Sequence, residues 1–208
     1  ASLSITAQSL FNKAFDYENY IGNLEPVSGP GGFLICSTIR YDLGYLDGFQ
    51  FTRFDSTGNV ILTRAFSTGS LVNVMQWGAL SLARSNGTYA FLFGSSPSNG
   101  GYRPSLRVFN TTASGSIIWN RLVSYSAQDS SFDFIGAMDQ AFEETPDEGY
   151  LITGLRKSPS SGAPVVVKLD STGNILWNKT YDLHQPWGWH VVSDVDETGT
   201  LLLGFHAD

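Results

Sequence analysis

One strand-like segment occurs four times in this chain at nearly regular intervals. Each copy begins with an apolar pair or an apolar–aromatic pair, continues with Asn or Thr and a basic residue, and ends on an apolar residue. The copies are Leu10–Phe15, Ile61–Phe66, Ile118–Val123 and Leu176–Tyr181. They start 51, 57 and 58 residues apart. Periods of this size are typical of architectures in which each repeat packs against its neighbours. The sequence therefore predicts four copies of one structural unit.

Three further strands are expected in each unit, before the recurring segment. Explicit tight turns precede it at Asp55–Asn59, Asn110–Ser116 and Asp170–Asn174. Asp or Asn opens such a turn by bonding its own backbone, and Gly supplies a positive φ. The first strands are expected at Gly22–Val27, Gly78–Ala83, Ala137–Glu143 and His190–Val195, the second at Phe33–Ser37, Tyr89–Gly94, Tyr150–Gly154 and Leu201–Gly204, and the third at Phe49–Phe54, Ser105–Phe109 and Val165–Leu169.

This order of strands predicts an all-β fold, a β-propeller of four blades with four antiparallel strands each. The chain starts with the third and fourth strands of a unit and ends with the first and second, so its two ends complete one shared sheet (2+2 closure) and leave no exposed edge there. We expect a single propeller domain over 1–208. Its parts are a closing hairpin (1–15), blades at 16–66, 67–123 and 124–181, and a half blade (182–208) completed by 1–15.

Closure is expected to place Leu3–Thr6 beside Leu201–Phe205 of the same chain. The same pairing made head to tail with a neighbour would give a filament. A longer repeat array would give a ring with more blades. The composition agrees with an all-β protein rich in tight turns, since 13% of the residues are aromatic, only 15% are charged and 22 are Gly.

The segments Glu148–Gly154 and Val165–Tyr181 resemble a known class of repeats. They are similar to the "GGYLIAG … VVKLDSTGNxxWxKTYG" repeats of secreted and cell-surface β-propellers, and loosely to quinoprotein-type blades. The resemblance is specific mainly over 148–181, and Leu62 stands where the other units have Trp119 and Trp177. It implies a propeller fold and a location at the cell surface. It implies no catalytic residues.

Charge and hydropathy exclude several classes of protein. The net charge of −7 disfavours nucleic acid and anionic membrane surfaces, because phosphate groups require a basic face. No stretch approaches the roughly 20 apolar residues of a membrane helix. The chain starts at Ala1 without an initiator Met, which agrees with a leader already removed or a start chosen within a longer chain. The single cysteine, Cys36, does not fix the compartment.

Three Asn-x-Ser/Thr sequons favour a secreted glycoprotein. They begin at Asn86, Asn110 and Asn178. In the expected strand order, Asn86 and Asn110 fall in turns, and Asn178 follows Trp177 on the outermost strand. If Trp177 points into the core, Asn178 points out, so all three are expected to be exposed and open to glycosylation. The predicted location is extracellular or at the cell surface.

The segment 184–190 is the strongest candidate for a ligand site. It holds Trp187 and Trp189 together with His184 and His190 in a connection that opens on one face of a propeller. Exposed Trp can stack on sugar rings, and His can bond hydroxyl groups, which suggests a glycan or partner contact. The alternative is that one of these Trp residues plugs a narrow central channel. Another aromatic pair, Trp119 and Trp177, repeats at one blade position and is expected to pack between blades.

No metal site, cofactor or catalytic motif is predicted. His184, His190 and His206 lack the spacing of a zinc site. The Asp-rich segments at 145–149 and 194–199 lack the ligand spacing of a calcium hand, and their Asp and Gly suit ordinary turns. No nucleophile elbow or phosphate-binding loop occurs. A pair of carboxylates brought together from distant blades is left open, since sequence does not reveal it.

The leading hypothesis is a non-enzymatic extracellular or cell-surface propeller that acts as a structural, adhesion or assembly module, including a filament component. Its expected partners are proteins or glycans at the cell surface, or further copies of itself. One alternative is a lectin-like binder that uses Trp187 and Trp189. A second alternative is a polysaccharide-active enzyme on the same scaffold.

Overall fold

The computed structural model describes residues 20–29, 31–40, 48–67, 72–97, 105–123, 142–158, 161–181, 190–199 and 201–206. Within these ranges the chain forms antiparallel β-sheets only. No helix in the described part of the chain is long and apolar enough to cross a membrane. The all-β prediction is therefore confirmed for the described residues.

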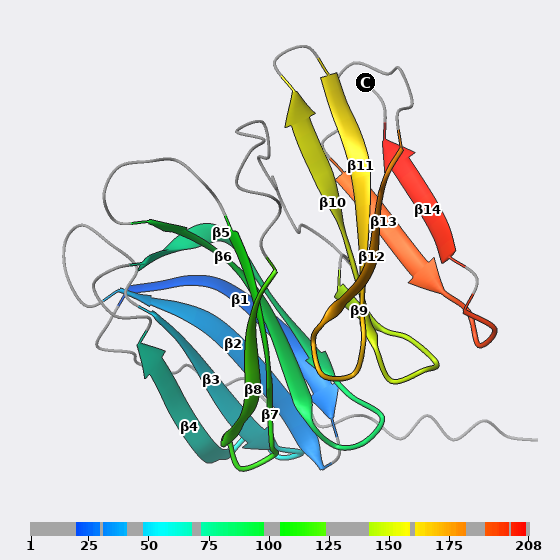
Figure 1. The fold of residues 1–208 in the computed structure, drawn as a ribbon. Coiled ribbons are helices and arrows are strands. Elements are labelled where there is room, and N and C mark those ends of the chain that lie inside the picture. Colours follow the sequence, from blue (N-terminus) through cyan, green and yellow to red (C-terminus); the bar gives the residue numbers. More distant parts are fainter. Residues whose placement is uncertain are drawn as a thin grey trace, which may run out of the picture.

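In the described part of the chain, fourteen strands form three sheets of four strands and one of two (Figure 1). The first sheet has the order β1 (Tyr20–Gly29), β2 (Gly32–Arg40), β3 (Gly48–Asp55), β4 (Val60–Ser67). The second has β5 (Val72–Ala83), β6 (Tyr89–Pro97), β7 (Ser105–Thr111), β8 (Ile117–Val123). The third has β9 (Phe142–Glu144), β10 (Tyr150–Ser158), β11 (Ser161–Leu169), β12 (Ile175–Thr180), and the fourth pairs β13 (His190–Val195) with β14 (Leu201–His206).

The recurring segment of the sequence forms the outer strand of each four-stranded sheet. β4, β8 and β12 contain three of its four copies, and each lies at a sheet edge. The strands follow one another in chain order within every sheet, as the repeat predicts. The fourth copy, Leu10–Phe15, and the pairing expected for Leu3–Thr6 lie outside the described residues.

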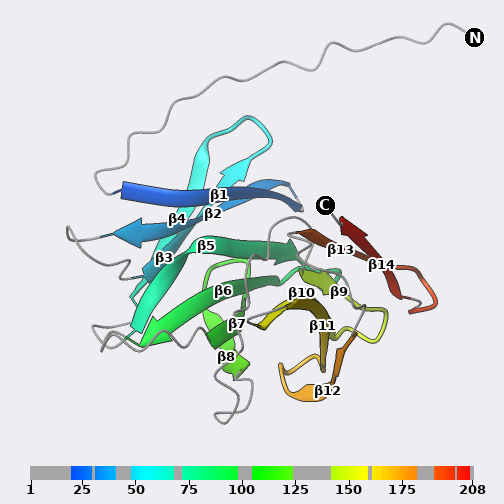
Figure 2. The same ribbon diagram turned by 90° about the horizontal axis from the view of Figure 1, so that it is seen from above.

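Successive sheets lie side by side, each turned relative to the one before (Figures 1 and 2). The first strands of the first three sheets are neighbours, since β5 contacts both β1 and β9, and β13 contacts β10, the second strand of the third sheet. The outer strands β4, β8 and β12 lie away from this line of inner strands. This is the radial arrangement of propeller blades.

The middle sheet buries both of its faces. Tyr89 and Phe91 of β6 pack toward the first sheet, in a cluster with Leu34, Phe51 and Phe109. The alternate residues, Ala90 and Leu92, belong to a second cluster shared with the third sheet. Since side chains alternate along a strand, one strand serves two interfaces. The apolar runs in the sequence are thus explained by sheets that are covered on both sides.

Two hairpins are closed by the predicted Asp-Ser-Thr-Gly-Asn turn. The Oδ1 atom of Asp170 accepts hydrogen bonds from the backbone N of Thr172 (2.8 Å) and of Asn174 (2.9 Å). Hydrogen bonds from the Asn174 side chain and backbone, with those from Thr172, lower the pKa of Asp170 to about 2. Asp55 makes the same bonds in its own turn, and bonds from Thr57 and Asn59 lower its pKa strongly.

The turn predicted to open at Asn110 begins two residues later. Thr112 occupies the place of Asp55 and Asp170, because its backbone N donates to the Ser116 O atom (2.9 Å) and its Oγ1 accepts from the Ser116 N (3.1 Å). Asn110 and Thr111 remain inside β7. The sequence contains an earlier Asn that resembles a turn opener, while a Thr performs that role here.

Candidate functional site

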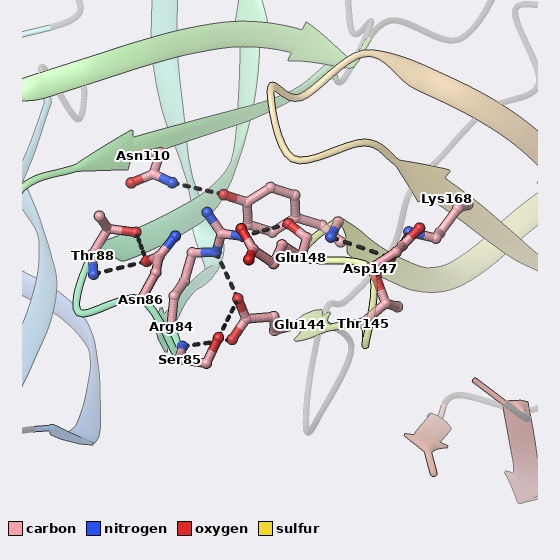
Figure 3. Close-up of polar contacts among 12 residues, drawn as sticks. Arg84, Ser85, Asn86, Thr88, Asn110, Glu144, Thr145, Asp147, Glu148 and Lys168 are labelled. Carbon is pink, nitrogen blue, oxygen red and sulfur yellow. Dashed lines mark hydrogen bonds and ion pairs between the residues drawn. The ribbon is translucent and has the colours of Figure 1, made fainter. Parts of the chain in front are cut away.

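A cluster of charged and polar side chains joins the second and third sheets at the end that carries the tight turns (Figure 3). Arg84 and Ser85 follow β5, in the turn that leads to β6, and Glu144 ends β9. Tyr150 begins β10 directly after the turn 145–149. We call the contacts among Arg84, Ser85, Glu144, Tyr150 and Asn110 the seam cluster.

Arg84 is the centre of the seam cluster and is only 5% exposed. Its Nε atom donates to Oε1 of Glu144 at 3.1 Å, and its Nη2 donates to the backbone O of Glu148. Ser85 donates its backbone N (2.7 Å) and its Oγ (3.2 Å) to the same carboxylate. Both oxygens of Glu144 are therefore occupied. A buried ion pair satisfied in this way fixes geometry, and removing one partner leaves an uncompensated charge.

Tyr150 is fully buried and fills the space beneath the Arg84 guanidinium, which lies 4.6 Å from the ring centroid. The ring stacks on Phe142 (5.6 Å between centroids) and meets Trp119 edge-on (5.5 Å). Asn110 Nδ2 donates to the phenolic oxygen at 2.8 Å. Burial raises the pKa of Tyr150 to about 12, against the smaller lowering effects of Arg84 and Asn110. The phenol is thus neutral at physiological pH.

A second polar group, next to the seam cluster, ties a turn to its own sheet. The Nζ atom of Lys168, on β11, donates to Asp147 Oδ1 (2.7 Å), Thr145 Oγ1 (2.8 Å) and the backbone O of Leu169 (3.1 Å). These bonds use all three protons of the ammonium group. The hydrogen bond from Lys168, followed by that from Thr145, lowers the pKa of Asp147 to about 2.

The seam cluster and the hydrogen bonds of Lys168 hold the turns together, and neither provides an acid or base that is open to a substrate. The Glu144 carboxylate and the Lys168 ammonium are saturated by partners, and Tyr150 holds its proton at neutral pH. In the ranges that the structure describes, no set of three or more His, Cys, Asp or Glu residues could hold a metal ion. The seam cluster therefore supports the scaffold.

We expect the neutral Tyr150 to make the protein sensitive to alkali. Its folded-state pKa is about 12, above the ordinary value of 10.0. Stability from the neutral phenol is present below pH 10 and is lost as the pH rises from 10 to 12, because only the unfolded chain releases the proton easily. The melting temperature of wild type should therefore fall more steeply over this range than that of Tyr150→Phe. Parallel curves for the two proteins would contradict this assignment.

Most of the predicted ligand residues lie outside the described ranges. This applies to His184, Trp187 and Trp189, and the side chain of His190, the first residue of β13, is not described either. The structure therefore does not test whether these four residues form the predicted glycan contact. The seam cluster was not predicted. Lys168 could have been noticed as the single charge in an apolar run of five residues, whereas nothing local marks Arg84 as the partner of Glu144, 60 positions away.

The two repeated tryptophans have different surroundings. Trp119 packs against the buried cluster shared by the second and third sheets, as predicted. Trp177 is 37% exposed, with the Lys179 Nζ atom 5.4 Å from its ring centroid. The prediction that both rings pack between blades is thus confirmed for Trp119 alone.

The expected exposure of the three sequons is wrong at Asn110. This residue is 2% exposed and its side-chain amide is bonded to Tyr150. It lies on β7 rather than in a turn, so the folded chain leaves no room for a glycan there. Asn86 and Asn178 are exposed. The Asn86 side chain accepts from the backbone N (3.1 Å) and the Oγ1 (2.7 Å) of Thr88 within its turn.

Comparison with known proteins gives likeness in fold alone. No protein-family model matches the chain, and no curated protein matches its sequence. Among solved structures, CoXyl43, a GH43 β-xylosidase/α-arabinofuranosidase from a compost microbial metagenome in complex with xylotriose, matches 78% of this chain at 10% identity with a TM-score of 0.51. The GH43_1 enzyme from Xanthomonas citri complexed with xylose matches 89% at 12% identity with a TM-score of 0.50. The chain spans 59% of the length of each of these proteins.

These comparisons support the β-propeller fold and overturn the leading functional hypothesis. The two solved structures named above are glycoside hydrolases, with sheets arranged as five-bladed propellers. The prediction of a non-enzymatic structural, adhesion or filament module is therefore contradicted, as is the prediction that the chain is no enzyme.

Proposed function

We propose that this chain is a polysaccharide-active enzyme, a glycoside hydrolase that acts on polysaccharides containing xylose or arabinose. The observation that carries the proposal is the likeness in fold to a β-xylosidase/α-arabinofuranosidase bound to xylotriose, over 78% of the chain. Fold alone does not determine chemistry, so the activity has to come from residues of this chain.

The catalytic carboxylates are proposed to lie at the end of the sheets opposite the tight turns. Glycoside hydrolysis uses one carboxyl group as acid and another as base or nucleophile. Glu144 and Asp147 are occupied by Arg84 and Lys168, and Asp55 and Asp170 are occupied by their own turns. Among the other acidic residues, the candidates are those that precede β1, fall in the connections β2–β3, β8–β9 and β12–β13, or follow β14: Asp16, Glu18, Asp42, Asp47, Asp129, Asp133, Asp139, Asp182 and Asp208.

Aromatic residues of the same connections are proposed to bind the sugar rings. Trp187 and Trp189 precede β13, next to His184 and His190. An indole ring offers a flat apolar face to the C–H side of a pyranose, and imidazole can bond to its hydroxyl groups. Under the proposal, these four residues contact substrate and take no part in proton transfer.

The test is bond cleavage by the purified chain. It is incubated with arabinoxylan, linear xylan and the p-nitrophenyl glycosides of β-xylose and α-arabinofuranose, and released reducing ends or nitrophenol are measured. Release of sugar is the expected result. If a folded preparation cleaves none of these substrates, the proposal is overturned.

Variants separate catalytic carboxylates from structural ones. Each candidate acid is changed to its amide, and two of these changes are expected to abolish cleavage while the melting temperature stays within a few degrees of wild type. The matched control is Asp170→Asn, whose carboxylate serves only its turn. It is expected to keep full activity. Trp187→Ala and Trp189→Ala are expected to raise KM more than they lower kcat.

We also propose a ring of four blades that is closed by residues 1–15, in a protein that is secreted or held at the cell surface. Three four-stranded sheets and the pair β13–β14 support this count. Exposed sequons at Asn86 and Asn178 support the location. A loss of mass on treatment with a glycosidase that removes N-linked glycans, absent from the Asn86→Gln/Asn178→Gln variant, is the result expected for native material.

A further inference from the structure

The outer strand β12 has no covering neighbour among the described residues. All six of its residues are exposed, and Trp177 retains 37% of its surface. The equivalent strand β8 is covered where Trp119 packs against the third sheet. Since the two strands repeat the same sequence pattern, Trp177 and Lys179 of β12 correspond to Trp119 and Arg121 of β8. We call such a pair on an outer strand a seat, and the segment that covers it the occupant; the seat on β12 is uncovered among the described residues.

On the outer strands β8 and β4, the covering segment is a tight turn of the next sheet. In the third sheet, Gly173 of the β11–β12 turn lies on β8, and a Cβ atom there would come within 2.7 Å of Trp119 Cζ3 and 2.9 Å of Arg121 Cγ. In the second sheet, Gly115 lies in the same way on the first, where a Cβ would come within 2.5 Å of Phe51 Cζ and 2.7 Å of Arg64 Cγ. Both glycines have φ near +80°. Close contact and positive φ each require glycine.

Sequence spacing identifies a fourth turn of this kind. Three turn glycines, Gly58, Gly115 and Gly173, each precede the basic residue of their outer strand by six positions. The copy of the recurring segment at Leu10–Phe15 carries its basic residue at Lys13, and six positions before it stands Ala7. This copy belongs to none of the three four-stranded sheets.

We propose that the turn formed by residues 4–9 of the same chain sits on Trp177 and Lys179, and that Ala7 makes this seat the weakest of the ring. The sheet β13–β14 has two strands in the described part of the chain, so it has room for a third and a fourth. The buried Gly58 fits the reciprocal contact, in which Phe11 and Lys13 stand to Gly58 as Trp119 and Arg121 stand to Gly173. The inference rests on the proposed closure of the ring by residues 1–15 and not on the proposed enzymatic activity.

A pair of introduced cysteines tests which chain fills the seat. In a Cys36→Ser background, Ala7→Cys is combined with Lys179→Cys. By equivalence with Gly173 and Arg121, these side chains lie within reach of a disulfide. Mild oxidation is expected to give a cross-linked monomer. A cross-linked dimer, which places a second copy in the seat, or the absence of a bond would overturn the proposal. The matched control Ala7→Cys/Arg121→Cys is expected to stay reduced, because Gly173 occupies that seat.

Replacement of Ala7 by glycine tests how tightly the turn sits. Ala7→Gly removes the Cβ and permits positive φ, so the melting temperature is expected to rise by about 2–4 °C. The control Ala14→Gly weakens a strand and is expected to lower the melting temperature. An unchanged or lower melting temperature for Ala7→Gly would contradict a turn of the Gly115 and Gly173 kind.

Discussion

Replacement of Arg84 by methionine is expected to lower the free energy of unfolding by about 3–4 kcal/mol. Methionine keeps most of the apolar stem and removes the guanidinium. It leaves the Glu144 carboxylate, with a side chain only 16% exposed, without its ion-pair partner, and leaves the Glu148 carbonyl without a donor. It also removes the cation above the Tyr150 ring. Denaturation in urea, followed by tryptophan fluorescence, measures the change.

A double-mutant cycle separates the ion pair from the packing. Glu144→Gln alone leaves a buried cation and should also be costly. In the double variant Arg84→Met/Glu144→Gln neither charge remains, so its loss of stability should be smaller than the sum of the single losses by about 1–3 kcal/mol. The exposed Arg64, changed to methionine, should cost no more than about 0.5 kcal/mol. Simple additivity of the two single losses would contradict the seam cluster as described.

Replacement of Phe91 by alanine is expected to cost about 3–5 kcal/mol. Phe91 is 1% exposed, and its ring lies 5.5 Å from that of Phe51 on the first sheet and 5.6 Å from that of Phe109 on its own sheet. Truncation opens a cavity between two sheets whose backbones are held apart by other aromatic rings. The loss of dispersion contacts therefore adds to the lost burial of the side chain.

The matched control for Phe91 is Ile118→Ala on the outer strand β8. Ile118 is 51% exposed, so its truncation should cost about 1 kcal/mol or less. The same urea denaturation serves both variants. If Phe91→Ala costs no more than Ile118→Ala, the first and second sheets do not pack against each other through this ring.

The strands and turns were predictable because their signals are local. The apolar run at the start of β6 and the Asp-Ser-Thr-Gly-Asn turns at Asp55 and Asp170 act within a few residues, and the structure confirms them. The burial of Asn110 was not predictable in this way. A sequon does not reveal which way a side chain points, and the turn that Asn110 was expected to open starts at Thr112.

The contacts between sheets could not be predicted from the sequence, for a different reason. Arg84 and Glu144 belong to separate units, and each would be an ordinary charged residue next to a turn if read alone. Only the packing of the second sheet on the third brings them together. Trp119 was predictable as a packing residue because it repeats. The exposure of Trp177, at the same repeat position, depends on which segment covers β12 and not on the residue itself.

The double-faced middle sheet also limits how this chain can change over evolutionary time. A single inserted residue in β6 would exchange the places of Phe91 and Leu92 and turn each toward the wrong neighbour. Length variation is therefore confined to the linkers. Two residues separate β1 from β2, and five separate β5 from β6, β9 from β10 and β13 from β14, whereas four residues separate β4 from β5 and eighteen separate β8 from β9. A connection on the rim of the β4–β5 and β8–β9 linkers can therefore change length without altering which sheet each residue of β6 faces, whereas an insertion within β6 cannot.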